Sequence, residues 1–336
     1  MHAGRKLAVL GTATVLTFGF AAETIALEWN VSLWGKRRAF TEHVEKLAEL
    51  VSEKTNGEFK LNLAYGESLS KSRENLDGIS IGAFEMAQFC ASYHADKNPT
   101  LTVLELPFLG VPDLETQVEL DRAVYAHPAV EKDLARWNAR LVMSSPMPQY
   151  NFVGKGDAPT QVSDFEGMRV RALGGVGTAM ETIGAVPTTV TASETFQAID
   201  SGTVRAASFA PHAHLSFNTV EAGNWWTTNL NPGTVNCPVV VNIDAYNALP
   251  DNFKEAFDSS VGPAIDHYLA TYEKVYDRWY PTLEEMNIEQ VTFPKEQIDA
   301  FKAKAGQPLW DAWVAEMDAK GIPGKELLEL VQSKLN

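Results

Sequence analysis

The sequence predicts an α/β protein built from two lobes. Strand-like and helix-like segments alternate between residues 27 and 91, and the alternation begins again between residues 167 and 210. A long amphipathic segment follows over residues 253–279. Strands that alternate with helices are typical of parallel βαβ units. Their recurrence within 336 residues therefore indicates two such units in one chain.

The first unit is predicted from its hydrophobic periodicity. Apolar residues alternate in the strand segments, as they do in half-buried strands. Apolar residues recur every three or four positions in the first helical segment, and Gly57 stands where that helix would end. The predicted elements are strands over 27–34, 59–65 and 84–91 and helices over 40–51 and 72–82.

The second unit repeats this order beyond Pro148. Two α/β units in series imply two lobes, and ligands of such sheets bind beyond the carboxyl ends of the strands. The two lobes are therefore expected to face a shared cleft. The predicted elements are strands over 167–173, 186–190 and 204–210 and helices over 177–183 and 193–199.

A single long helix is predicted from Phe253 to Trp279, where apolar residues keep a spacing of three to four. Gly262-Pro263 is expected to bend it, because proline lacks a backbone donor and clashes with the preceding turn. A helix of this length would brace both lobes or lie on the surface of one. Residues 295–336 are also predicted to be helical, with breaks at Pro308 and over 321–324.

The first 26 residues have the pattern of a secretory signal peptide. Arg5 and Lys6 precede an uncharged stretch over 7–22, and Ala26 is a small residue suited to cleavage. A membrane anchor is the alternative, but this stretch is shorter than the roughly 20 apolar residues that a span needs. We therefore expect an exported, soluble mature protein.

Charge and cysteine content exclude several classes of function. The formal net charge is −15, whereas a nucleic-acid partner requires a basic face, so no such partner is expected. Cys90 and Cys237 are the only cysteines and form no CxxC pair, which excludes a structural zinc cluster; no metal site is predicted. The two thiols could pair in an oxidising compartment or remain separate in the core.

Several short motifs follow one another along nearly the whole mature chain. They are the segment 68–82, Leu-Glu-Leu-Pro-Phe at 104–108, Asp-Phe-Glu-Gly-Met-Arg-Val-Arg at 164–171, Ser-Glu-Thr-Phe-Gln-Ala-Ile at 193–199, and Leu249-Pro250 ahead of the long helix. Each motif alone is weak, but their order is specific, and in this order they resemble the solute-binding proteins of tripartite ATP-independent periplasmic (TRAP) transporters.

This resemblance implies a periplasmic binding protein-like fold with a long helix bridging both lobes. Lobe I would comprise residues 27–148 and about 237–280, and lobe II residues 149–236 and about 281–336. The implied role is a periplasmic receptor that binds a small organic acid and delivers it to the large and small permease subunits, acting as a monomer without a cofactor and without catalysis. An exported enzyme acting on a small acidic substrate is the alternative.

Arg171 is the position at which the resemblance places the family's anchoring arginine. A guanidinium offers a planar fork of donors that can bind a carboxylate with two hydrogen bonds. Arg169 lies on the same face of the predicted strand and is the competing candidate. Without the resemblance, Arg171 would be interpreted as an exposed strand residue.

Further ligand contacts are expected at strand ends and between the lobes. Each could instead pack in a core or hinge. The resemblance places Phe209 at a ligand-facing position near which many members of the family have Asn or Trp. Its apolar ring favours a small or partly apolar monocarboxylate over a dicarboxylate; a zwitterion or cation held by aromatic rings is a further alternative. The other predicted contacts are Trp34, Glu67, Ser92, Tyr93, Asn151, Trp225 and Asn236.

Two short motifs compete with this interpretation. Gly174-Gly175-Val-Gly177 opens a predicted helix, but Met180 stands where a dinucleotide loop requires its third glycine. His212 and His214 have the spacing of metal ligands, but no further ligands are evident beside them. We therefore expect neither a bound dinucleotide nor a metal ion.

Overall fold

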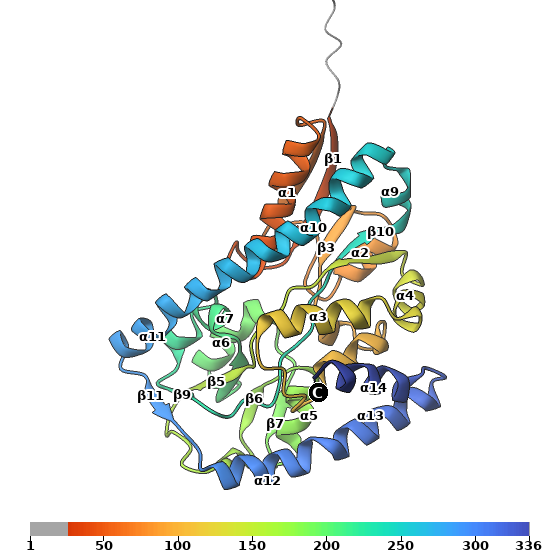
Figure 1. Ribbon diagram of the computed structural model, residues 1–336. Coiled ribbons are helices and arrows are strands. Elements are labelled where there is room, and N and C mark those ends of the chain that lie inside the picture. Colours follow the sequence, from red (N-terminus) through yellow and green to blue (C-terminus); the bar gives the residue numbers. More distant parts are fainter. Residues whose placement is uncertain (1–25, 336) are drawn as a thin grey trace, which may run out of the picture.

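The computed structural model describes residues 26–335, so the predicted signal peptide, apart from Ala26, lies outside the described residues. The strands form two mixed sheets, one of five strands and one of six (Figure 1). The first sheet contains, in spatial order, β2 (Phe59–Ala64), β1 (Leu27–Leu33), β3 (Met86–Gln88), β10 (Val239–Asn242) and β4 (Ala139–Met143).

This five-stranded sheet and its helices are called lobe I. β1 pairs in parallel with β2 and β3, as expected, with Val31 opposite both Leu63 and Met86. β10 is antiparallel to β3 and β4, because the chain returns to this sheet from the other lobe instead of through a crossover helix. The helices of lobe I are α1 (Glu42–Lys54), α2 (Asn75–Ser80), α3 (Leu114–Tyr125), α4 (Pro128–Ala135) and α9 (Ile243–Ala248).

The six-stranded sheet and its helices are called lobe II. β6 pairs in parallel with β7 and β8, whereas β5 is antiparallel to β8 and β9. The strands are, in spatial order, β11 (Glu289–Val291), β9 (Trp225–Thr227), β5 (Asn151–Gly154), β8 (Ala206–Phe209), β6 (Arg169–Arg171) and β7 (Val186–Thr188). The helices are α5 (Gly174–Glu181), α6 (Thr195–Asp200), α7 (Pro211–Ser216), α8 (Thr219–Ala222) and α12 (Lys295–Ala305).

Short 3-10 turns connect many of these elements, and two of them border the space between the lobes. They are η1 (Ala39–Thr41), η2 (Ala91–Tyr93), η3 (Pro99–Glu105), η4 (Val162–Phe165), η5 (Ala192–Glu194) and η6 (Glu273–Val275). η1 follows β1 and η2 follows β3, so both continue from the ends of lobe I strands. These strand ends are where a ligand of such a sheet is expected to bind.

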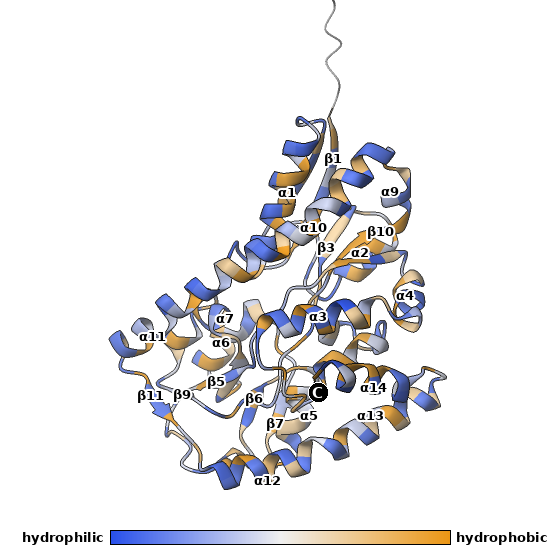
Figure 2. Ribbon diagram, in the orientation of Figure 1, coloured by the Kyte–Doolittle hydropathy of each residue, from blue (hydrophilic) through white to orange (hydrophobic). Residues whose placement is uncertain are grey.

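The long helical segment contacts both lobes, which confirms the bridging helix. α10 (Asp251–Tyr272) runs diagonally across the molecule and continues through η6 into α11 (Tyr276–Glu285) (Figure 1). Phe257 packs in the core of lobe I, whereas Trp279 packs against β5 and β9 of lobe II. The α-helix continues through Pro263, where the sequence predicted a bend. It is interrupted instead at η6, where the backbone forms a short 3-10 turn. Figure 2 shows apolar and polar residues alternating along this segment.

The last two helices pack on lobe I, not on lobe II as expected for residues 281–336. α13 (Gln307–Ala319) and α14 (Gly324–Leu335) insert Met317 and Val331 into a core formed with η3, α3 and α4. The Trp313 Nε1–H also donates to Thr102 Oγ1 at 2.8 Å. α12 remains on lobe II, so the chain crosses between the lobes at the break before α13. The apolar faces of these two helices therefore hold them on lobe I, because these faces are buried against its core.

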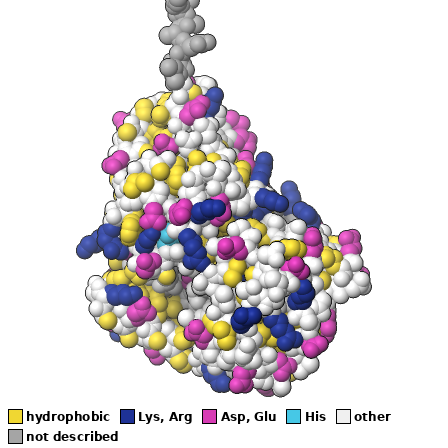
Figure 3. Space-filling view, turned by 180° about the vertical axis from the view of Figure 1, so that it is seen from behind, with side chains coloured by type: hydrophobic (Ala, Val, Ile, Leu, Met, Phe, Trp, Pro, Cys, Tyr) yellow, Lys and Arg dark blue, Asp and Glu magenta, His cyan; other side chains and the backbone are white. Residues whose placement is uncertain are grey.

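The surface carries charged side chains of both signs. Figure 3 shows Lys and Arg interspersed with Asp and Glu over the face seen from behind. None of the helices in residues 26–335 combines the length and apolar composition needed to cross a bilayer.

Candidate functional site

A small buried cavity lies between the two lobes. Its volume is about 20 Å³, and its lining comes from strand ends of both sheets and from the two segments that cross between them. Four of the predicted ligand contacts, Trp34, Tyr93, Arg171 and Phe209, line it. The other lining residues are Arg38, Phe40, Cys90, Met147, Tyr150, Leu173, His212, Ala213, Phe217, Val235 and Cys237.

Arg171 is the buried cation on the lobe II side of this cavity. Its side chain is 1% exposed, and its guanidinium lies 4.1 Å from the centre of the Phe209 ring. Nε donates to Val190 O at 3.1 Å and Nη1 donates to Ser208 O at 2.9 Å, so backbone carbonyls set its orientation. Among the described residues, no carboxylate oxygen lies within 4.0 Å of it. A guanidinium buried without an anion is suited to bind one.

Tyr93 closes the cavity from lobe I. Its hydroxyl oxygen accepts from Arg171 Nη2 at 3.2 Å and from the Ala192 backbone N–H at 3.0 Å, and both donors belong to lobe II. A second contact between the lobes joins the Arg73 guanidinium to Thr189 O, and this guanidinium also lies over the Tyr93 ring. The lobes therefore meet across the cleft in this conformation.

Arg38 is a lining residue that the sequence analysis did not single out. It follows β1, and its guanidinium lies 4.7 Å, 4.9 Å and 5.2 Å from the ring centres of Trp34, Phe40 and Phe217. Burial lowers the pKa of Arg38 to about 10, which leaves it positively charged at neutral pH. Arg38 could have been found by the argument that selected Trp34, since both follow the carboxyl end of the same strand.

The other unpredicted lining residues left weaker signals in the sequence. Tyr150 and Met147 lie on the segment between β4 and β5, whereas His212 and Phe217 lie in and just after α7. Phe217 stacks on Phe209 with ring centres 5.8 Å apart and on Trp34 at 6.3 Å. Only the packing of the two lobes brings these rings together, so no local pattern predicts them.

Ser92 and Asn236 do not line the cavity but contact a buried acid beside it. Ser92 Oγ donates to Glu105 Oε2, and the Asn236 backbone N–H donates to Glu105 Oε1 at 2.9 Å. A Cβ at Gly175 would lie 1.8 Å from Glu105 O, so the glycines of 174–177 let α5 pack directly on η3. This packing accounts for the glycine-rich motif. Burial raises the pKa of Glu105 to about 7.

We expect the Glu105→Gln variant to be more stable than the native protein at high pH. The folded-state pKa of about 7 exceeds the ordinary value of 4.5, so the Glu105 contribution to stability is fully present below pH 4.5 and is lost as pH rises towards 7. A shift of this size corresponds to about 3 kcal/mol. Chemical denaturation should show the variant's advantage at pH 8 and almost none at pH 4. A difference that stays constant with pH, or one shared by the exposed control Glu74→Gln, would contradict this assignment.

The remaining three predicted contacts lie outside the cavity lining. Glu67 is partly exposed and its Oε1 accepts from the Ser72 backbone N–H at 2.9 Å. Asn151 is buried and its Nδ2 donates to Thr227 O at 2.7 Å, which joins β5 to β9. Trp225 is fully buried in the lobe II core. Trp225 and its neighbour Trp226 pack in different clusters on opposite faces of β9, and neither lines the cavity.

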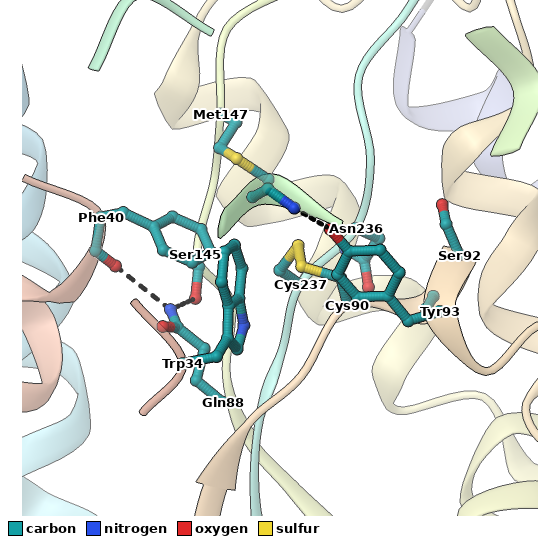
Figure 4. Close-up of a disulfide and its surroundings, with 12 residues drawn as sticks. Trp34, Phe40, Gln88, Cys90, Ser92, Tyr93, Ser145, Met147, Asn236 and Cys237 are labelled. Atoms are coloured by element: carbon teal, nitrogen blue, oxygen red, sulfur yellow. Dashed lines mark hydrogen bonds between the residues drawn. A yellow bond between two sulfur atoms is a disulfide. The ribbon is translucent and has the colours of Figure 1, made fainter. Parts of the chain in front are cut away.

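Cys90 and Cys237 form a disulfide, the first of the two alternatives left open by the sequence. Figure 4 shows it among Trp34, Tyr93 and Met147, which belong to the same buried cluster. The bond lies beyond the paired ends of β3 and β10, where the Ala91 N–H donates to Asn236 O at 2.8 Å. It therefore joins lobe I to the segment that returns from lobe II.

Other polar side chains hold the lobe I wall of the site in place. Gln88 Nε2 donates to Phe40 O at 3.1 Å and to Ser145 Oγ at 2.8 Å (Figure 4). These two bonds connect β3 to η1 and to the first crossing segment. The wall is therefore positioned by buried hydrogen bonds from a central strand of lobe I.

His212 and His214 do not act as a pair. The Nδ1 atom of His212 lies 2.6 Å from Tyr272 Oη, whereas that of His214 lies 2.6 Å from Thr219 Oγ1. Burial lowers the pKa of His214 to about 3, which keeps its ring neutral. Within residues 26–335, no three His, Cys, Asp or Glu side chains lie grouped as ligands for a metal ion.

A basic groove of about 560 Å³ adjoins the cavity and shares Arg38 and His212 with it. Its lining includes Lys36, Arg37, Lys274 and Arg278, together with the carboxylate of Glu42. Arg37 is paired with Glu42 through an Nε–Oε1 contact of 3.0 Å. On a protein with a net charge of −15, this groove is a local positive region that would attract a small anion.

Two α/β lobes, a bridging helix and a cationic site between the lobes define a two-domain ligand-binding protein. The comparisons with known proteins give the particular family. Residues 31–317 match the bacterial extracellular solute-binding proteins, family 7, and the chain belongs to this family. The family predicted from the sequence is thereby confirmed, as is its role as a solute receptor.

Characterised relatives and solved structures agree with this assignment. A monocarboxylate 2-oxoacid-binding periplasmic protein of Nostoc sp. is 25% identical over 74% of this chain and 68% of its own length. The 2,3-diketo-L-gulonate-binding periplasmic protein of Escherichia coli is 22% identical over 97% of this chain and 96% of its own. A TRAP periplasmic solute-binding protein from Desulfovibrio salexigens, with bound orotic acid, superposes with a TM-score of 0.82 at 18% identity, covering 91% of this chain and 98% of its own.

Proposed function

We propose that this protein is the periplasmic receptor of a TRAP transporter and binds a small organic acid through its carboxylate at Arg171. The observation that carries the proposal is the Arg171 guanidinium, which is 1% exposed and has no carboxylate partner among the described residues. A buried charge without a counter-ion is costly, and a bound anion removes that cost. The binding proteins named above, which take 2-oxoacids, diketo-gulonate and orotic acid, support an acidic ligand.

The walls around Arg171 favour a compact monocarboxylate with an apolar or flat body. Trp34, Tyr93, Phe209 and Phe217 present rings to the cavity from both lobes. Such rings bury a small ligand with little loss of conformational entropy. A related solved structure, specific for aromatic acids and in complex with 3-hydroxybenzoate, has the same fold at a TM-score of 0.82.

Binding requires the lobes to separate. The cavity of about 20 Å³ has room for about one water molecule, whereas a site for an organic molecule needs roughly 300 Å³ or more. On entry, the acid's carboxylate would replace the Tyr93 hydroxyl at Arg171 Nη2. The two lobes, residues 27–148 with about 237–280 and residues 149–236 with the segment up to α12, would then close on the acid. A ligand that contacts both lobes shifts the equilibrium towards the closed form.

Other parts of the proposal concern the protein's partners and location. The chain would be exported through a signal peptide cleaved after Ala26, would act as a monomer, and would deliver the acid to the large and small permease subunits. It would catalyse no reaction. Incubating the purified protein with a bound acid and measuring that acid over time tests this last point, since its conversion would favour the exported enzyme instead.

The proposal is tested with Arg171→Ala and a matched control, Arg169→Ala. Arg169 lies two residues away on β6, is exposed, and donates from Nη2 to Gly202 O at 3.1 Å. A thermal-shift screen of organic acids identifies a ligand, and calorimetry then measures its Kd. Losing a buried charge-assisted contact of about 2–3 kcal/mol should raise Kd roughly 30- to 150-fold in Arg171→Ala. Arg169→Ala should bind the ligand with the native Kd. If the two variants bind it with the same Kd, Arg171 is not a ligand-binding residue.

A further inference from the structure

Three buried hydrogen-bond donors on the lobe I side of the cavity have no acceptor among the described residues. They are Nε and Nη2 of Arg38 and Nε1 of Trp34. The two side chains are 8% and 7% exposed, and both line the cavity that Arg171 lines from lobe II. Buried donors are nearly always paired, so three unpaired donors around one cavity indicate a binding function.

The unpaired nitrogens of Arg38 form one edge of its guanidinium. Nη1 is already engaged, because it donates to Trp34 O at 3.3 Å and to Lys36 O at 2.7 Å. Nε and Nη2 remain, and this edge can donate two parallel hydrogen bonds to oxygen acceptors. No carboxylate oxygen among the described residues lies within 4.0 Å of Arg38. On Arg171, by contrast, all three nitrogens already have a protein partner.

The local backbone holds Arg38 in this position. Gly35 has a φ of 77°, and a Cβ there would lie 2.7 Å from Arg38 Nη1, so the turn after β1 requires glycine. The rings of Trp34 and Phe40 from lobe I and of Phe217 from lobe II surround the guanidinium. Arg38 is thus a fixed group that lines the cavity between the lobes and retains two unpaired donors.

We infer that Arg38 and Trp34 bind a second, oxygen-bearing group of the same acid whose carboxylate binds Arg171. This inference rests on the proposed function and narrows its substrate class. All three lobe I groups are donors, so the second group must be an acceptor: a keto or lactam carbonyl, or a second carboxylate. An acid with a hydrocarbon or ammonium group at that end would leave the donors unpaired.

The arrangement also gives each lobe its own cationic contact with the ligand. Arg171 stands on β6 of lobe II and Arg38 follows β1 of lobe I. An acid that binds both arginines is held completely only when the lobes are closed. The second acceptor group therefore couples recognition to closure.

The test uses pairs of acids in which one member lacks an acceptor group that the other carries: 2-oxoisovalerate and isovalerate, and glutarate and butyrate. The native protein should bind the oxygen-richer member of at least one pair ten-fold or more tightly. Arg38→Met keeps the length of the side chain but removes the donors. It should raise the Kd of that member at least ten-fold and change that of its counterpart less than two-fold. A preference for 2-oxoisovalerate over isovalerate would identify the second group as a carbonyl. A preference for glutarate over butyrate would identify it as a second carboxylate.

Further variants separate a binding role from a structural one. Trp34→Phe removes the indole N–H while keeping an aromatic ring, and it should weaken binding of the same member by a smaller factor. The exposed control Arg136→Met, on lobe I and outside the cavity lining, should bind normally. The ligand-free melting temperature of Arg38→Met should not fall, because the variant loses a buried, unpaired charge.

Each other outcome overturns a specific statement. If Arg171→Ala abolishes binding but Arg38→Met binds every acid normally, the second contact is absent and the donors serve only ordered water. Equal losses for both members of a pair, with a lower melting temperature, would make Arg38 a structural residue. If none of the acids in the thermal-shift screen or in these pairs binds the native protein, the proposed function fails together with this inference.

Discussion

Replacing both Cys90 and Cys237 by alanine should lower the free energy of unfolding by about 2–5 kcal/mol. The bond joins residues 147 positions apart, and the chain between them includes β5 to β9 of lobe II. Closing so long a loop restricts the unfolded chain strongly, and the entropic cost of this restriction approaches 5 kcal/mol in the simplest treatment. Both sulfurs are buried, so the native state also loses packing between the lobes.

Guanidinium denaturation of the native protein and the double variant measures this effect. The native protein under strong reductant should approach the stability of the variant, whereas reductant should leave the variant unchanged. The double serine variant serves as a second comparison, because it adds two buried hydroxyls and should be less stable still. If reduction leaves the midpoint of the native protein unchanged, the bond contributes nothing to stability.

Trp225→Ala should cost about 3–5 kcal/mol of folding free energy while leaving the ligand site intact. The indole is fully buried and packs edge-to-face on Phe165, with ring centres 6.3 Å apart. It also lies directly on Gly154, where a Cβ would be 2.1 Å from Trp225 Cζ2. Neighbouring side chains cannot fill the space of an indole, so a cavity remains in lobe II.

Two further variants test this account of Trp225. Gly154→Ala should be destabilising by about 1–3 kcal/mol, because its methyl group overlaps the ring. Trp225→Phe should lose less than Trp225→Ala, since a ring still covers Phe165. Ligand affinity of the folded fraction should stay at the native value in all three. If Trp225→Ala lost ligand affinity but kept the stability of the native protein, Trp225 would be a ligand-binding residue and this account would be wrong.

The sequence predicted the elements whose burial follows a local period. In β1, Trp29, Val31 and Leu33 are buried while Glu28 and Asn30 are exposed, so the alternation of residues in the sequence corresponds to the two faces of the sheet. In residues 253–279, apolar residues recur every three to four positions, which likewise predicted a helix. Such spacing places them on one face of the helix, and this face must pack against other parts of the protein along its length. The partner proved to be both lobes.

The residues around the cavity were less predictable. Arg171 could be proposed because its motif resembles a family, and Trp34 and Tyr93 because they follow strand ends. Ser92 and Asn236 were selected by similar arguments but contact Glu105. Which polar group a strand-end side chain reaches depends on how the lobes pack, and that packing brings together residues more than a hundred positions apart, such as Glu105 and Asn236.

The sequence alone determined the α/β class, the two repeated units, the bridging helix and the family. Each of these follows from local hydrophobic periodicity or from the order of short motifs along the chain. Tertiary structure decided the disulfide, the position of α13 and α14 on lobe I, and the placement of Arg38 and Arg171 in the lining of one cavity. The physical reason is that burial, hydrogen bonding and charge compensation depend on which surfaces meet. Residues 38 and 171 line a common cavity only because two separate sheets close on the same small space.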